Sequence, residues 1–250
     1  MTIDTRVDGD FFEWGQTIPF SVTVVDPEDG AIDCGAVEVS LVLVHDSHGH
    51  GESTVTGCSG TLPTTADLAF HGGYLAAGVS VSYTDEGANG QPPLSTTVQH
   101  VVQTRRPQPE FAQDARGLTY PAVNVVEPDP GGGQVAASID NGDYLALNNR
   151  YSFGNMNKGI AFRFAQASAA GTARGLVEVR ADSPTGDVVA TCTLAATGGA
   201  NTYTTQPCAF TSPVTGSRRL YLMFRQAPGG PATNFGNLNW VQFSGAGVGF

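Results

Sequence analysis

The chain has 250 residues and a formal net charge of -11, and only 14% of its residues are charged. This acidity excludes nucleic acid and anionic membrane surfaces as expected partners, because both require a basic binding face. The 32 glycines, the 15 prolines and the lack of an apolar run of transmembrane length favour a globular protein rich in turns and β-strands.

The N-terminal half predicts four short strands, because β-branched residues alternate with other residues at a period of two. These strands cover residues 18–25, 37–44, 78–84 and 96–103. Turn clusters such as DPEDG and TDEGANGQPP separate them, and the segment TRRPQPE then breaks the pattern with two prolines. The sequence therefore predicts an immunoglobulin-like β-sandwich at residues 1–104, followed by a linker at residues 105–110.

The C-terminal half predicts a second β-sandwich, of the jelly-roll type, at residues 111–250. Glycine-rich turns such as DSPTG and ATGGAN separate its apolar runs, and none of them has helical periodicity over a useful length. The predicted strands cover residues 134–139, 143–147, 159–165, 176–181, 187–195, 218–224 and 238–243. The expected fold class is all-β, with two β-sandwich domains in tandem.

The four cysteines predict one disulfide in each half, Cys34 with Cys58 and Cys192 with Cys208. No CxxC spacing occurs, so a zinc site built from thiolates is not supported. Disulfides persist in oxidising compartments, and we therefore expect a secreted, extracellular protein. The N-terminal sequence MTIDTRVDGDFF lacks the basic and apolar order of a signal peptide, so we expect Met1 to mark a cut within a longer chain.

Five blocks of the second half resemble a family 6 carbohydrate-binding module: SIDNGDYLAL, GLVEVRADSPTGDVVAT, ATGGANTY, GSRRLYLMF and FGNLNWVQF. The resemblance runs from about Glu110 to Phe243 and implies a lectin-like β-sandwich that binds sugars without cleaving them. One cleft of that family uses an aromatic residue just before the IDxGD block, an aromatic residue in the TGGWxxW/Y loop and an asparagine in the last block. The first two positions here are Ser138 and Ala200.

The sugar site that the resemblance implies contains Tyr203 and Asn237, which match the family pattern, together with Asn201. Tyr144, Tyr151 and Phe235 of neighbouring loops complete its aromatic platform. Aromatic rings stack on the apolar side of a pyranose, and amides hydrogen-bond its hydroxyls. Packing in the core or at its rim is the alternative for each ring, and the one we favour for Tyr144 and Trp240. Two further alternatives are a site on the concave sheet face and a module that has become a spacer.

The resemblance also implies a structural calcium ion. The family takes ligands from acidic residues of the first strand and of the final block, and here these positions are Gln113 and Asn239, with Asp182 or Asp114 as a further ligand. Amide oxygens can bind calcium but carry no charge, so we expect a lower affinity. Polar residues that only satisfy turns are the alternative.

The first half resembles an immunoglobulin-like domain of the polycystic kidney disease (PKD) type. The sequence PFSVTVVDPEDGAIDCGAVEVSLVLVHDSHGHGESTVTGCSG, followed by VSYTDEGANGQPPLS, is similar to the PKD-like domain of large secreted actinobacterial proteins that carry sugar-dehydrogenase-like or trehalose-utilisation-type domains. Such proteins often end in a family 6 module. The resemblance implies a longer parent chain with an attached catalytic domain.

The motif HDSHGH predicts a metal site. His48 and His50 project to the same side of an extended segment, and a hairpin brings His45 back toward them, with Asp46, Glu52 or His71 as a fourth ligand. Imidazoles suit zinc or copper, and a structural role is favoured over catalysis. The alternative is a polar hairpin tip, because Asp46 and the neighbouring serine and glycine are common turn residues.

No catalytic arrangement stands out, because the chain has no GxSxG motif and most acidic residues of the second half fall in turns. We therefore expect no enzyme but a monomeric, carbohydrate-binding accessory region that holds a catalytic domain near a polysaccharide or oligosaccharide. The alternatives are a structural or protein-interaction spacer with a degenerate sugar site and, less favoured, a metalloenzyme centred on the histidines.

Overall fold

The computed structural model describes residues 1–27, 30–45, 48–65, 73–88, 90–123, 132–154 and 157–245. Its contacts divide the chain into two compact units: unit 1 comprises residues 1–71 and 75–104, and unit 2 comprises residues 72–74 and 105–250. The helices in these described ranges are two short 3-10 turns, η1 (Cys34–Ala36) and η2 (Pro109–Phe111). None of the helices found there is long and apolar enough to cross a membrane. The predicted all-β class is confirmed.

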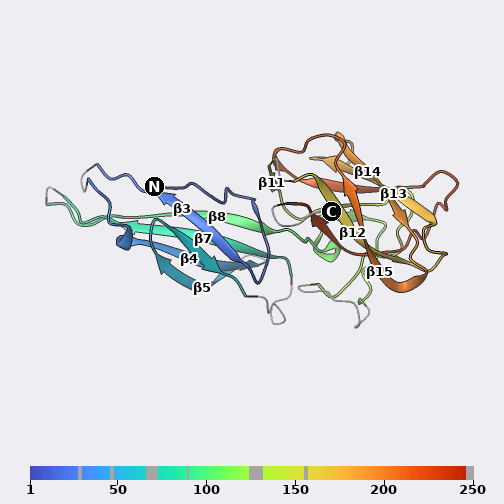
Figure 1. Ribbon diagram of the computed structural model, residues 1–250, viewed down its shortest axis with the longest axis horizontal. Helices are drawn as coiled ribbons and strands as arrows, with labels where there is room; N and C mark the ends of the chain where they lie inside the picture. Colours follow the sequence, from blue (N-terminus) through green and yellow to red (C-terminus); the bar gives the residue numbers. More distant parts are fainter. Residues whose placement is uncertain are drawn as a thin grey trace. The chain divides into compact units, whose positions relative to one another are not determined.

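Unit 1 consists of two sheets, with strand orders β1-β3-β6 and β2-β8-β7-β4-β5 (Figure 1). Neighbouring strands are antiparallel except β2 and β8, which are parallel. The strands are β1 (Thr2–Ile3), β2 (Phe11–Phe12), β3 (Thr17–Thr23), β4 (Val37–His45), β5 (His48–Thr56), β6 (Ser59–Pro63), β7 (Leu75–Thr84) and β8 (Ser95–Thr104).

The core of unit 1 lies between these two sheets. In β4 every second residue from Val37 to Leu43 is buried, as the period-two pattern predicts. The first three, Val37, Val39 and Leu41, form one apolar cluster with Ile18 and Phe20 of β3 and with Leu62 of β6. Because the cluster draws on both sheets, unit 1 is a β-sandwich.

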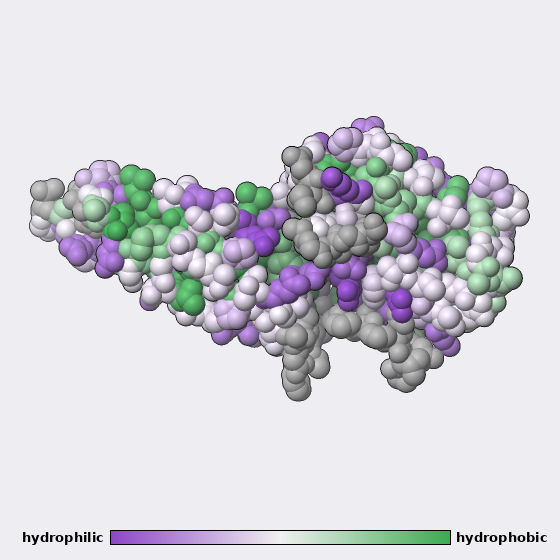
Figure 2. All heavy atoms as spheres, in the orientation of Figure 1, coloured by the Kyte–Doolittle hydropathy of each residue, from purple (hydrophilic) through white to green (hydrophobic). Residues whose placement is uncertain are grey.

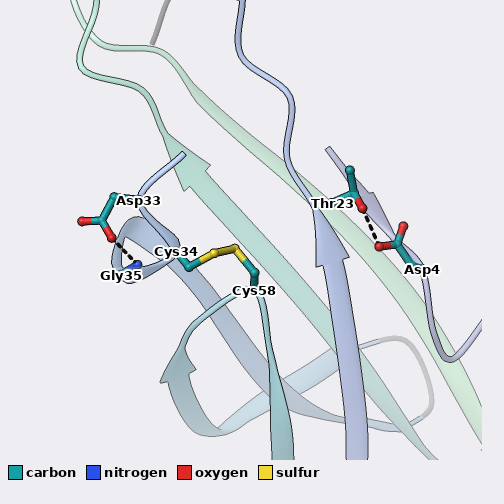
Figure 3. The surroundings of a disulfide bond; sticks show 6 residues. All are labelled: Asp4, Thr23, Asp33, Cys34, Gly35 and Cys58. Atoms are coloured by element: carbon teal, nitrogen blue, oxygen red, sulfur yellow. Dashed lines mark hydrogen bonds between the residues drawn. A yellow bond between two sulfur atoms is a disulfide. The ribbon is translucent and has the colours of Figure 1, made fainter. Parts of the chain in front are cut away.

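The predicted disulfide between Cys34 and Cys58 is confirmed, and it joins the start of β4 to the segment after β5 (Figure 3). The Asp33 side chain caps η1 by accepting a hydrogen bond of 2.8 Å from the backbone N–H of Gly35. This cap satisfies an amide that the short turn leaves without a partner. The crosslink therefore starts from a locally ordered turn.

β5 lies at one end of the five-stranded sheet. Its register with β4 shifts by one residue, because Leu41 pairs with Ser53 but Val42 pairs with Gly51. Glu52 is the extra residue, so the edge strand carries a β-bulge with a charged side chain.

Unit 2 contains a five-stranded sheet of order β14-β13-β17-β10-β9, a three-stranded sheet of order β15-β12-β18 and a short pair, β11-β16 (Figure 1). Its strands are β9 (Asp114–Arg116), β10 (Tyr144–Ala146), β11 (Tyr151–Phe153), β12 (Gly159–Gln166), β13 (Ala173–Ala181), β14 (Val188–Ala195), β15 (Gly199–Ala209), β16 (Gly216–Arg218), β17 (Leu220–Arg225) and β18 (Asn237–Phe243).

The core of unit 2 is rich in aromatic side chains that are fully buried, including Phe162, Phe164 and Phe224. The first two come from the three-stranded sheet and Phe224 from the five-stranded sheet. The predicted disulfide between Cys192 of β14 and Cys208 of β15 is confirmed, and it ties one sheet to the other. On the visible surface, hydrophilic and hydrophobic residues are interspersed (Figure 2).

Candidate functional site

The positions of the expected sugar cleft come together at one end of the three-stranded sheet. In the central strand β12, Ala165 pairs with Asn237 of β18 and Gln166 pairs with Gly199 of β15. The segment that contains Ser138 joins this end, because Ala136 exchanges backbone hydrogen bonds of 2.8 and 2.9 Å with Leu238. We call this region the loop end; its residues are Ser138, Ala200, Asn201, Tyr203 and Asn237.

The loop end offers little aromatic surface. Ser138 and Ala200 carry no ring, and the Ser138 hydroxyl lies 3.0 Å from the hydroxyl of Thr119. Tyr203 is only 8% exposed, and it packs in an apolar cluster that includes Ala165. Little of its ring remains for a sugar to stack on.

Two of the predicted rings are buried completely. Tyr151 and Phe235 both have 0% exposure, so their proposed stacking role is wrong. The reason is that both side chains point into the aromatic core; Tyr151, for example, lies 5.1 Å from Phe243 between ring centroids. The two predicted asparagines differ, because Asn201 is exposed and Asn237 is half-buried.

The outer face of the five-stranded sheet carries a second group of polar and aromatic side chains. The sequence did not predict that these side chains lie together. Met223 of β17 pairs with Tyr144 on one side and with Glu178 on the other. One step along the same strand face, Tyr221 pairs with Arg180 of β13. Directly paired residues point to the same face. We call this set the sheet face; its residues are Asp114, Tyr144, Glu178, Arg180, Tyr221, Met223 and Arg225.

Arginines hold the carboxylate of Glu178 in place on the sheet face. Its Oε2 accepts hydrogen bonds from Nη2 of Arg180 at 2.9 Å and from Nε of Arg225 at 3.1 Å. Burial disfavours the charged form of this carboxyl, but the hydrogen bonds and charges of the two arginines outweigh it and lower its pKa. Glu178 is therefore a fixed acceptor beside two cationic donors.

The tyrosines of the sheet face lie diagonally on neighbouring strands and are both half-buried. The Tyr144 hydroxyl donates a hydrogen bond of 2.8 Å to Oδ2 of Asp114, and this bond raises the pKa of the phenol. Met223 lies between Tyr144 and Glu178 and is 7% exposed. Apolar ring surface, an apolar floor and fixed charged groups thus occur together, as sugar recognition requires.

The predicted calcium ligands do not come together as one set. Asp182 follows β13 and Gln113 precedes β9, with β17 and β10 between them. Three strand spacings amount to roughly 14 Å, which is too far for one ion. Asp182 is also ion-paired with Arg150 at 3.0 Å and Arg218 at 2.8 Å. The prediction that Asp182 completes the site is therefore wrong.

Asn239, the remaining predicted calcium ligand, is fully buried in β18. Neither polar atom of its amide has a hydrogen-bond partner among the described residues. Such an orphaned amide fits the role of a calcium ligand.

The predicted histidines of unit 1 lie together at the tip of the β4–β5 hairpin. One ring nitrogen of each of His45, His48 and His50 lies within 4.8 Å of those of the other two. Asp46 and His71, two of their predicted partners, lie outside the described residues.

Comparison with known proteins decides the family. The model of the family "Carbohydrate binding module (family 6)" matches residues 120–245, half of the chain. The chain belongs to carbohydrate binding module family 6. Both the loop end and the sheet face lie mainly within the matched residues.

Individual relatives of this family 6 module agree in extent. An arabinoxylan arabinofuranohydrolase of Bacillus subtilis (strain 168) is 34% identical over 135 residues, 53% of this chain. The chain spans 24% of the length of that relative. A family 6 module from Clostridium cellulolyticum in complex with xylose is 33% identical, with a TM-score of 0.47 over 56% of this chain and 95% of the other. A β-1,3-glucan binding module from Bacillus halodurans is 27% identical, with a TM-score of 0.46 over 56% and 94%.

Proposed function

We propose that unit 2 binds a polysaccharide or oligosaccharide on its sheet face, without cleaving it. The observation that carries this proposal is that two half-buried tyrosines, Tyr144 and Tyr221, share one sheet face with the fixed carboxylate of Glu178. Stacking of a pyranose on the rings and hydrogen bonds from its hydroxyls to Glu178 and the arginines supply complementary contacts. Family membership supports sugar as the ligand class.

The burial of the predicted rings supports the sheet face over the loop end. Asn201 and Asn237 remain polar groups with surface available, but the ring that their family cleft would use is almost fully buried at Tyr203. Hydrogen bonds from amides alone compete poorly with water, because each such bond contributes little net free energy in an open site. We therefore assign the loop end a minor role.

We further propose that the chain is an accessory region of a secreted, multidomain protein. Unit 1 would be an immunoglobulin-like, PKD-type spacer, and unit 2 would hold an attached catalytic domain near its glycan by raising the effective concentration. The two disulfides support an oxidising location. Because a relative with 34% identity is named for its action on arabinoxylan, that polysaccharide is the first ligand to test.

The alternative function is a spacer that has lost its sugar site, and the observation that favours it is the absence of rings at Ser138 and Ala200. The two functions make opposite predictions for sugar binding by the whole chain. Binding of any polysaccharide by the wild type would exclude the spacer, and its absence across a broad panel would support it.

The test is affinity electrophoresis of the whole chain through gels that contain arabinoxylan, β-1,3-glucan or another soluble polysaccharide. We expect one glycan to retard the wild type and the variant Tyr144→Phe, which keeps the ring. The double variant Tyr144→Ala/Tyr221→Ala should migrate without retardation. The matched control, Asn201→Ala/Asn237→Ala at the loop end, should remain retarded. The reverse result for the two double variants would move the site to the loop end.

A further inference from the structure

Three of the five histidines of the chain lie on one face of the β4–β5 hairpin tip. His45 pairs directly with His48, and His50 pairs with Leu43, which lies two residues before His45 in β4. Direct partners in an antiparallel pair share a face, as do alternate residues of one strand. The backbone register alone therefore gathers the three imidazoles.

The rings are close enough to share one ion. The distances between ring centroids are 4.2 Å from His45 to His48, 5.1 Å from His45 to His50, and 4.8 Å from His48 to His50. The Nε2 atoms of His45 and His50 lie 3.1 Å apart. Tetrahedral zinc keeps its nitrogen ligands about 2.0–2.1 Å from the metal and so roughly 3.3 Å from one another. His45 and His50 are already near that spacing, and a nitrogen of His48 lies within 4.8 Å of both.

The glycine between two of these histidines allows the strands to approach closely. A Cβ atom at Gly49 would lie 2.7 Å from Cγ1 of Val42 and 3.3 Å from the carbonyl oxygen of Leu43. Any larger residue would push β5 away from β4 at the place where the imidazoles meet. The alternation of histidine and glycine thus places the rings on one face and leaves the opposite face free for close contact.

The surroundings of the cluster suit a bound ion. His45 is half-buried, and His48 and His50 are exposed. The same face of the sheet carries Leu43 and Leu75, which form a small apolar cluster. An apolar wall on one side strengthens the attraction between an ion and its ligands, and solvent on the other side gives the ion access.

We propose that His45, His48 and His50 bind one zinc or copper ion, with a remaining coordination position open to water. Three nitrogen donors and an open position are a ligand set that both metals accept. The ion would join the two strands at the hairpin tip and stabilise unit 1. This site lies in unit 1 and is independent of the sugar site proposed for unit 2.

His100 shows how a histidine of the same unit is used otherwise. It lies in β8, and its Nδ1 lies 2.9 Å from the backbone carbonyl oxygen of Arg6, within hydrogen-bond distance. This contact accounts for His100 without an ion. His100→Gln is therefore a matched control for changes at the hairpin tip.

The test is calorimetric titration of the whole chain, freed of any affinity tag and of metal, with ZnSO₄, CuSO₄ and CaCl₂ separately. We expect one zinc or copper ion per chain at the histidines, and we expect the response to calcium to be the same in the wild type and in His48→Gln/His50→Gln. The double variant His48→Gln/His50→Gln should bind at least about tenfold more weakly, because even indirect changes near metal ligands weaken binding by that factor. The control His100→Gln should bind like the wild type.

A second measurement on the wild type does not depend on any variant. The electron paramagnetic resonance spectrum of the copper complex should show nitrogen ligation, and zinc should raise the melting temperature of the wild type but not that of the double variant. Far-UV circular dichroism checks the fold of each variant without metal. The proposal is overturned if the wild type binds neither ion, if the double variant binds as tightly, or if the copper spectrum lacks nitrogen ligands.

Discussion

The loop end and the sheet face of unit 2 belong to the same sandwich but use their aromatic residues in opposite ways. At the loop end, Tyr203 packs in a cluster of small apolar residues, and Ser138 and Ala200 carry no ring. On the sheet face, Tyr144 and Tyr221 stand on neighbouring strands beside ion-paired charges. An aromatic ring is available to a ligand when the sheet face that carries it is not covered by other parts of the chain. A position in a loop does not by itself leave a ring exposed.

The largest expected effect is on folding, at Tyr203. Replacing this 8% exposed side chain by alanine leaves a cavity beside Ala165, and we expect Tyr203→Ala to lower the free energy of unfolding by about 3 kcal/mol. Denaturant unfolding followed by fluorescence measures it. A change near zero, accompanied by weaker sugar binding, would mean that Tyr203 is a binding residue after all.

The next effect is on sugar affinity, at Glu178. Glu178→Gln removes a charged acceptor and leaves two arginines without their shared partner, so we expect binding to weaken by about 1.5 kcal/mol. Calorimetric titration with the glycan that retards the wild type measures the loss. Thr193→Ala, at an exposed position of β14, is the control and should bind normally.

The ionisation of Glu178 adds a pH dependence with a defined sign. Since its pKa in the folded protein is lowered, the ion pairs are complete above the ordinary glutamate range and are lost as the pH falls through the lowered pKa. We expect both sugar affinity and the free energy of unfolding to decrease in that acid range. In Glu178→Gln this part of the decrease should vanish, and an unchanged pH profile would contradict the role of the carboxylate.

A smaller effect is expected at Tyr144. Tyr144→Ala removes one of two rings and should weaken sugar binding by about 1 kcal/mol, whereas Tyr144→Phe should lose less because only the bond to Asp114 disappears. Equal losses in both variants would indicate that the hydroxyl, not the ring, contacts the sugar.

The smallest effect is expected at the loop end. Asn237→Ala changes a half-buried amide outside the sheet face, and we expect sugar affinity to change by less than about 0.5 kcal/mol. The same titration measures this change. A loss as large as that of Glu178→Gln would restore the loop end as the main site.

The sequence predicted the strands that alternate, because burial on one face leaves a period-two pattern. The run 37–44 became β4 and the run 187–195 became β14 almost residue for residue. The two longest strands that the sequence did not predict are β5 (HGHGESTVT) and β15 (GANTYTTQPCA), since most of their residues are exposed and polar or small. These two segments form strands because they pair with β4 and β12, and the strand propensity of their own residues does not predict this pairing.

The candidate sites were predicted unevenly for a related reason. The pairing of the histidines followed from a short turn and a period of two, both of which are local. The burial of Tyr151 and Phe235 depends on which sheet covers them, and this is a tertiary property. The alternation in β13 predicts that Glu178 and Arg180 point to the same, outer face of the sheet. The hydrogen bond between Glu178 and Arg225 depends on the pairing of β13 with β17, which the sequence did not predict.

The bulge at Glu52 bears on how this protein behaves beside other copies of itself. A regular strand at the end of a sheet exposes a row of backbone N–H and C=O groups. A second chain can add a strand by hydrogen-bonding to this row, and amyloid fibrils grow in this way. The extra residue interrupts that ladder and places a carboxylate beside the interruption. We expect the edge of β5 to resist such growth, so that unit 1 does not add strands from other copies of the chain.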